Sequence, residues 1–420
     1  MKIFDQIKKA CLLIAVFAAS LTACNKLELD ATPNPKPTQG TTPTLATLLD
    51  DPSFSLLKTV ITKAGLIPTL SVPSLRYTLF APDNDAISAS LAPILPPGVT
   101  PEMYIASLDA ETAKSISQYH LIPQEIPAAS IPGSFPNFQY PTLLNPAPSV
   151  SALLRLTTFP SVRSNGAWVN NVPIIATDID AVNGVMHKVL RLIMPPSKDL
   201  WSRITTDAEL TYLKAAIDRA DSGAVAGTRL QDALNTAVNP SAIASNLTLF
   251  APNDNAMKLF LTGAITQALI AQGAPPAMAQ AQAQALVAGY GTLLLSNPAS
   301  IPVYGGQLSA AITPTLAKGI VAYHILSSQS APYGPPGIRV FSVNLPASAT
   351  AVKTLLNSAV SIHPGVTVQA AFVSIAPGVA VVSSASVKGL ANAIASNIVT
   401  MDIHCVNGVI HKIDQALLPQ

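Results

Sequence analysis

The sequence predicts an α+β fold that the chain builds twice. Residues 176–196 and 400–420 align at an offset of 224 and share 9 of 21 residues, which indicates two copies of one domain. Within the first copy, segments with helical periodicity come first and strand-like segments later, without the regular alternation of a doubly wound parallel sheet. At 420 residues the chain also exceeds the length that one hydrophobic core usually serves.

The first copy is expected to open with helices. Asp51 and Pro52 supply an N-cap and a first-turn proline, apolar residues then recur every three to four positions, and Gly65 ends the pattern. Two more helices are expected at 101–107 and 110–119. After Ser151 the periodicity changes, and strands are expected at 153–159, 167–171, 174–178 and 185–193.

A strand followed by a capped helix is predicted at the same place in both copies. Residues 77–86 read YTLFAPDNDA and residues 247–256 read LTLFAPNDNA, with 6 of 10 positions identical. The β-prone TLF predicts a strand, the proline stops it, and the Asp/Asn cluster caps the helix that follows.

A Tyr-His pair is the next shared element, at Tyr119-His120 and Tyr323-His324. The second copy is longer by 34 residues before its pair and by 20 after it. The first of these insertions contains an Ala/Gln-rich run at 277–288 that predicts a helix, but its function cannot be read from the sequence. The two domains are predicted at 44–197 and 198–420, the second with insertions.

The closing motif Val-Asn-Gly-Val-x-His predicts a strand, a two-residue turn that accepts a positive φ, and a returning strand. Its histidine shares a strand face with β-branched residues, so it is interpreted as a packed core or edge residue. The motif is therefore expected to be structural in both copies, through Asn183, Gly184, His187, Asn407, Gly408 and His411.

The N-terminus predicts a lipoprotein. Lysines and a short apolar run precede Leu21-Thr22-Ala23-Cys24, which resembles a bacterial lipobox. Residues 1–23 are therefore expected to be a signal peptide, Cys24 to be lipidated, and the Pro/Thr-rich residues 24–43 to be a tether. Asn25 is not the aspartate that retains some lipoproteins in the inner membrane, so an outer-membrane location in the cell envelope is expected, with periplasmic or surface exposure left open.

Composition limits the possible partners. Charged residues make up 11% of the chain, against about 25% in typical soluble proteins. Without the predicted signal peptide, basic and acidic residues are equal in number, so nucleic-acid binding has no electrostatic support. The predicted lipid is the only expected link to a membrane.

No catalytic motif stands out. The sequence has no Gly-rich phosphate loop, GxSxG or HExxH, so an enzyme and a cofactor are not expected. The cluster Asp402, His404, Cys405 and His411 could suggest a metal site, but the first copy has Asp180 and Ala181 at the positions of 404 and 405. No metal is expected, and Cys405 is interpreted as a buried inert thiol.

The ordered set TLFAP, Tyr-His and Asn-Gly-Val-x-His, present twice, resembles a pair of fasciclin domains over residues 44–420. The resemblance implies α+β modules, each a twisted β-wedge or sandwich of about seven strands with helices packed on it, that serve in adhesion and matrix binding. It also implies binding roles for Tyr-His and Asp-Ile pairs, which here are Tyr119, His120, Tyr323, His324, Asp178, Ile179, Asp402 and Ile403. A structural role for the Tyr-His pairs stays open beside the binding role.

The expected function is that of a lipid-anchored, non-catalytic envelope protein that mediates adhesion or binds a cell-surface or matrix ligand, protein or glycan. One alternative is an accessory lipoprotein of a surface glycan-capture system that binds carbohydrate or an outer-membrane partner; another is an envelope spacer. Exposed rings would favour the glycan alternative, because sugars stack on them. The rings in question are Phe135, Phe138, Tyr140, Tyr304 and Tyr333.

Overall fold

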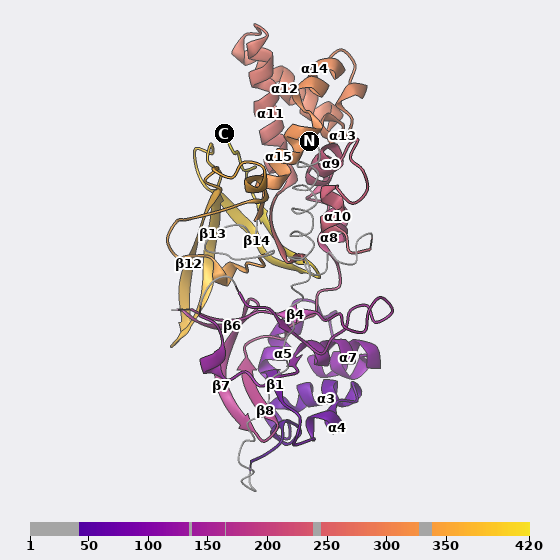
Figure 1. The fold of residues 1–420 in the computed structure, drawn as a ribbon, viewed down its shortest axis with the longest axis vertical. Coiled ribbons are helices and arrows are strands. Elements are labelled where there is room, and N and C mark those ends of the chain that lie inside the picture. The colour runs from indigo at the N-terminus through magenta and orange to yellow at the C-terminus, as the bar shows by residue number, and fades with distance from the viewer. Residues whose placement is uncertain (1–41, 134–136, 164, 238–244, 327–337) are drawn as a thin grey trace, which may run out of the picture. The chain divides into compact units, whose positions relative to one another are not determined.

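The structure is a computed structural model that describes residues 42–133, 137–163, 165–237, 245–326 and 338–420 (Figure 1). Residues 43–420 form one compact unit. The predicted signal peptide, Cys24 and nearly all of the tether lie outside the described residues, as do Phe135 and Tyr333. In the described part of the chain, we find no helix with the length and apolar character needed to cross a membrane.

The first half contains mostly helices before its main run of strands. The helices are α2 (Leu45–Leu48), α3 (Ser55–Lys63), α4 (Ile67–Leu70), α5 (Asn84–Leu91), α6 (Pro101–Ser107) and α7 (Ala110–Tyr119), with short 3₁₀ turns at Pro52–Phe54 and Ala128–Ser130. The strands are β1 (Tyr77–Pro82), β2 (Leu121–Ile122), β3 (Tyr140–Pro141), β4 (Thr157–Thr158), β5 (Pro160–Arg163), β6 (Gly166–Val169), β7 (Val172–Ala181) and β8 (Gly184–Val189).

The second half repeats this order with more helices. They are α8 (Leu200–Thr206), α9 (Thr211–Ala220), α10 (Leu230–Leu234), α11 (Asp254–Ala271), α12 (Pro276–Tyr290), α13 (Leu293–Ser296), α14 (Gly305–Ala311) and α15 (Pro314–Tyr323), with 3₁₀ turns at Pro298–Ser300, Ser342–Asn344 and Leu355–Ser358. The strands are β9 (Leu247–Pro252), β10 (Ile325–Leu326), β11 (Thr350–Val352), β12 (Val366–Ala376), β13 (Val379–Lys388), β14 (Ser396–Cys405) and β15 (Gly408–Ile413).

The two halves build the same sheet. The strand order is β2-β1-β8-β7-β6-β5 in the first and β10-β9-β15-β14-β13-β12-β11 in the second. In each, the TLFAP strand pairs in parallel with the last strand, β1 with β8 and β9 with β15, whereas its other neighbour and the rest of the sheet are antiparallel. The expected α+β fold of two domains, each with about seven strands, is confirmed.

The TLFAP strand of each domain is buried on both faces, which explains why its residues from Leu to Pro are all apolar. Leu79 and Ala81 of β1 pack toward the helices of the first half, and the intervening Phe80 packs into a second cluster on the opposite face. Leu249, Ala251 and Phe250 of β9 repeat this division. A strand that is buried on both faces loses the alternation of apolar and polar residues.

Most expected elements are present, but the strand predicted at 153–159 is wrong. Only Thr157–Thr158 is a strand, and Leu153 is 88% exposed. Side chains hold this segment in a turn instead: Asn145 Nδ2 donates to the Ser151 carbonyl, and the Ser151 hydroxyl accepts from the Leu153 amide. Such local bonds compete with a strand ladder.

The closing turn lies one residue earlier than the sequence predicts. The two-residue loop is Val182-Asn183, and Gly184 is already the first residue of β8, paired with Ala181. In the second half Cys405 pairs with Gly408 across the same kind of loop. The positive φ of +142° belongs to Gly184, where the chain passes close to the backbone of Tyr77.

Candidate functional site

The Tyr-His pair of the first domain lies at the end of α7 and is fully buried. His120 Nδ1 lies 2.9 Å from the Ile116 carbonyl, so Nδ1 carries the proton, and Nε2 accepts from the Ile193 amide at 3.1 Å. The Tyr119 hydroxyl donates to the Thr157 carbonyl. Burial lowers the pKa of His120 to about 4 and raises the pKa of Tyr119 to about 12.

The second pair repeats this arrangement at the end of α15. His324 Nδ1 lies 2.8 Å from the Ile320 carbonyl, and Nε2 accepts from the Leu417 amide at 2.9 Å. The Tyr323 hydroxyl donates to the Gly365 carbonyl. Burial lowers the pKa of His324 to about 4 as well. Each histidine thus connects the end of a helix to the C-terminal segment of its own domain, while a binding role for the pairs stays a prediction.

The asparagine of the closing motif joins the end of each domain to its beginning. The buried Asn183 side chain accepts from the Leu45 amide at 2.9 Å and donates to the Leu70 carbonyl at 2.7 Å. Asn407 accepts from the Leu200 amide at 2.9 Å and donates to the Leu234 carbonyl at 3.0 Å. Because α2 and α8 begin at Leu45 and Leu200, this amide satisfies a free helix N–H group in both domains.

The histidine of the closing motif is also part of the core. His187 Nε2 lies 2.9 Å from the Ile126 carbonyl and His411 Nε2 2.9 Å from the Val340 carbonyl. Nδ1 of each ring accepts a backbone N–H, from Asp178 and Asp402 respectively. The two rings are therefore neutral with the proton on Nε2, the opposite tautomer to the Tyr-His pairs.

The Asp-Ile pairs occupy bulges in the strand before the closing turn. Asp178 and Asp402 have φ of +56° and +59°, and the strand register shifts beside each. Asp178 is exposed, and its carboxylate accepts from the Ala128 amide. Asp402 is half-buried, and its carboxylate accepts from the amide and hydroxyl of Ser342. Ile179 and Ile403 are half-buried. The structure thus places each Asp beside the closing-motif histidine.

Two threonines in the repeated TLFAP motif have roles that were not predicted from the sequence. Thr78 is fully buried; its hydroxyl donates to the Gln124 carbonyl and accepts from the Ile126 amide. Thr248 makes the same pair of bonds with Ile338 and Val340. Both copies have threonine at this position of the motif, and this repetition is the sequence signal that could have identified the two residues. The loop that each threonine holds also supplies the carbonyl that the closing-motif histidine binds.

An arginine on the closing turn was missed because the two domains supply it from different positions. Arg76, just before β1, donates to the Val182 carbonyl at 2.9 Å. In the second domain Arg339 donates to the Val406 carbonyl at 2.9 Å. Arg339 is buried, and burial lowers its pKa to about 10. The repeat alignment cannot show this equivalence, since neither arginine has an arginine as its aligned partner.

Cys405 is buried and unpaired, and burial raises the pKa of its thiol to about 12. A thiol held protonated is a poor nucleophile. This agrees with its interpretation as an inert core residue.

The fasciclin domain family matches residues 52–195. A protein of Synechocystis sp., sll1483, is 30% identical over 144 residues, which cover 34% of this chain and 68% of that protein. The transforming growth factor-beta-induced protein ig-h3 of Sus scrofa is 31% identical over 166 residues, 37% of this chain but 20% of that protein's length.

A solved FAS1 domain pair from the insect cell adhesion molecule fasciclin I is similar over 88% of this chain and 98% of that structure, with 15% identity and a TM-score of 0.31. The family match covers the first half, and the second half repeats its strand order, its TLFAP strand and its closing turn. The chain belongs to the fasciclin-domain family and carries two such domains in tandem.

Proposed function

We propose that this protein is anchored by lipid in the cell envelope and that its two fasciclin domains bind a cell-surface or matrix ligand without catalysing a reaction. Fasciclin domains occur in adhesion proteins. The lipobox-like sequence ending at Cys24 supports the anchor, and Asn25 supports an outer-membrane location.

The observation that carries the proposal is how the histidines are used. All six lie in described residues; five of them hydrogen-bond through the ring to backbone groups, and His404 Nε2 lies 2.8 Å from the Arg339 guanidinium. A ring whose nitrogens are committed to backbone groups inside the core is poorly placed to take a proton from a substrate. This use of the histidines supports binding rather than catalysis.

Among the predicted binding residues, Asp178 is the exposed one. Its positive φ turns the backbone out of the regular strand, and the carboxylate bonded to Ala128 through Oδ1 keeps Oδ2 for another donor. The Asp178-Ile179 step of the first domain is therefore the proposed point of ligand contact.

Replacing the predicted lipidation site tests the anchor. With Cys24→Ala, no thioether to lipid can form, so we expect the protein to move from the membrane fraction to the soluble fraction when cells are broken and centrifuged. The buried Cys405→Ala is the matched control and should leave the protein in the membrane fraction. Retention of the Cys24→Ala protein in membranes would contradict the anchor.

A second candidate function is glycan capture, which one exposed ring favours. Phe138 is 56% exposed, whereas Tyr140 and Tyr304 are half-buried. An exposed ring offers a face on which a sugar can stack. The glycan would then bind at Phe138, away from the Asp178-Ile179 step in the sequence.

Binding by variants of the full chain distinguishes the two candidates, using a glycan array and a pull-down from envelope and matrix protein preparations. The principal proposal predicts protein binding that Asp178→Asn weakens at least tenfold and Phe138→Ala leaves unchanged; asparagine is chosen because it tolerates a positive φ. Glycan binding that Phe138→Ala abolishes, with Leu153→Ala as an exposed control, would favour the alternative instead.

A further inference from the structure

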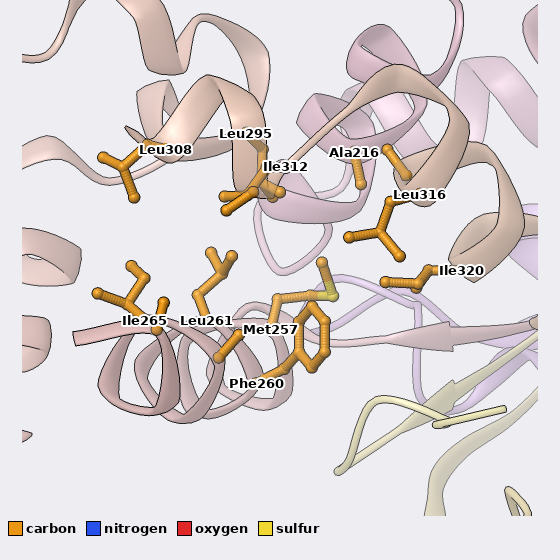
Figure 2. Close-up of a pocket in the computed structure, with 14 residues that line it drawn as sticks. Ala216, Met257, Phe260, Leu261, Ile265, Leu295, Leu308, Ile312, Leu316 and Ile320 are labelled. Carbon is orange, nitrogen blue, oxygen red and sulfur yellow. The ribbon is translucent and has the colours of Figure 1, made fainter. Parts of the chain in front are cut away.

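A pocket of about 170 Å³ lies in the second domain between α11 and the segment formed by α14 and α15 (Figure 2). Met257, Leu261 and Ile265 of α11 form one wall, and Leu308 and Ile312 lie across from them. The inner residues are almost fully buried, whereas Leu316 at the rim is 49% exposed. The pocket is therefore open to solvent on one side.

The insertion of the second domain builds much of this pocket. Between the TLFAP strand and the Tyr-His helix, the first domain has only α5 and α6, whereas the second has the long α11 followed by α12, α13 and α14. Leu295 of α13 and Leu308 of α14 belong to this added segment. The pocket is thus a property of the second domain rather than of the repeated fold.

The pocket offers no polar side chain to a ligand. Its fourteen lining residues are alanines, leucines and isoleucines with one methionine and one phenylalanine. Even the backbone at its edge is occupied, because the Arg219 guanidinium donates to the carbonyls of Ile312 and Ser309. A sugar or a peptide segment placed here would leave its own polar groups without partners, which disfavours both.

The volume of the pocket limits the size of the ligand group that can enter it. An apolar cavity of roughly 150 Å³ is known to bind benzene, so this pocket has room for a hydrocarbon group of about six carbons. Its alanines keep that space open, and Met257 can adjust to the shape of a flexible chain.

We propose that the pocket binds the end of an aliphatic chain belonging to an amphiphile, whose polar head stays in the water at the rim near Leu316. The hydrocarbon is the part that the lining can accept, and the open side gives the head its solvent. This site is independent of the proposed adhesion at Asp178 and of the predicted lipid on Cys24.

Alkyl glucosides test the proposal by calorimetric titration of the full chain carrying Cys24→Ala, in buffer without detergent and below the aggregation limit of each glucoside. Methyl, butyl and hexyl β-glucosides share one head and differ only in chain length. Because each buried methylene contributes about 0.8 kcal/mol, we expect affinity to rise about fourfold per methylene between butyl and hexyl. Methyl glucoside should not bind measurably.

Two neighbouring alanines of α14 provide the matched variants. Ala311 lines the pocket and Ala310 does not, although both are exposed. Ala311→Phe should fill the space and weaken hexyl glucoside binding at least tenfold, whereas Ala310→Phe should change it less than twofold. Ala264→Leu, on the α11 wall, serves as a second filling variant if Ala311→Phe alters the melting temperature.

Equal binding of methyl and hexyl glucosides, or equal effects of the two alanine variants, would overturn the proposal. So would a self-association in sedimentation velocity that Ala311→Phe abolishes and hexyl glucoside does not affect, because the occupant would then be a side chain of a second copy.

Discussion

Gly184→Ala is expected to lower the free energy of unfolding by about 2–6 kcal/mol, because backbone strain and steric overlap both act against the added methyl group. At φ +142° an L residue is strained, at a cost of about 1–3 kcal/mol. A Cβ on Gly184 would also overlap the carbonyl oxygen, the carbonyl carbon and the amide nitrogen of Tyr77. Those are backbone atoms of the neighbouring parallel strand, so no side-chain rotation relieves the overlap, which adds about 1–3 kcal/mol.

Gly98→Ala is the matched control for this prediction. Gly98 has φ +83° and nothing within 4 Å of an added Cβ, so its substitution should cost only the conformational strain. Urea denaturation of both variants gives the comparison. If Gly184→Ala lowers the free energy of unfolding no more than Gly98→Ala does, the close approach of β8 to β1 does not make glycine necessary at position 184.

Acid should destabilise both domains before their carboxylates titrate. The pKa of His120 and of His324 is about 4 in the folded protein, against roughly 6.5 in an unfolded chain. The unfolded state therefore takes up protons first as the pH falls, so the stabilisation is complete above pH 6.5 and is lost between about pH 6.5 and 4. At pH 5 the expected loss is about 2 kcal/mol for each ring.

Urea denaturation between pH 7 and pH 5 measures this loss. His120→Gln with His324→Gln should be less stable at pH 7, because the bonds to Ile193 and Leu417 change, but its stability should vary less with pH. Carboxylates, whose ordinary pKa values lie near 4, contribute little in this range. A variant with the same pH dependence as the parent protein would mean that these two rings are not the acid-sensitive groups.

The sequence predicts local features of this fold well where they depend on short-range signals. The helices at 101–107 and 110–119 have the predicted bounds, because a proline or an Asp cap sets the start of each. The Ala/Gln-rich run is the helix α12, as its composition predicts. The strand predicted at 153–159 was wrong because side-chain hydrogen bonds of Asn145 and Ser151 outweigh the weak β preference of this segment.

Features that depend on contacts between residues far apart in the chain could not be predicted from the sequence. The need for glycine at 184 arises from Tyr77, more than one hundred residues earlier in the chain. The pairing of Ala181 with Gly184, which places the turn at Val182-Asn183, was equally invisible in the sequence. The arginines on the closing turn come from unaligned positions, so the repeat does not reveal them. The apolar pocket needs α11, α14 and α15 to come together, and of these three the sequence predicts only the capped helix that becomes α11.

The candidate site shows the same limit. Repetition identified the Tyr-His pairs and the closing motif. It could not distinguish residues that bind a ligand from residues that hold the fold together, because either kind can be repeated in both domains. For His187 and His411, hydrogen bonds favour an architectural role, because the two buried rings accept the backbone N–H groups of Asp178 and Asp402. The exposure of Asp178 against the half-burial of Asp402 could not be read from two identical Asp-Ile pairs.

The central claim is that the repeated histidines are neutral links within the core. Nitrogen-15 NMR of histidine rings in the full chain, from pH 7.5 to pH 5, tests it most directly. We predict the Nδ1–H tautomer for His120 and His324 and the Nε2–H tautomer for His187 and His411. The rings of His120 and His324 should stay neutral down to about pH 6, with only about a tenth of each protonated at pH 5. Rings of His120 and His324 that titrate near pH 6.5, or that exchange between tautomers, would contradict the claim and return the Tyr-His pairs to the accessible surface.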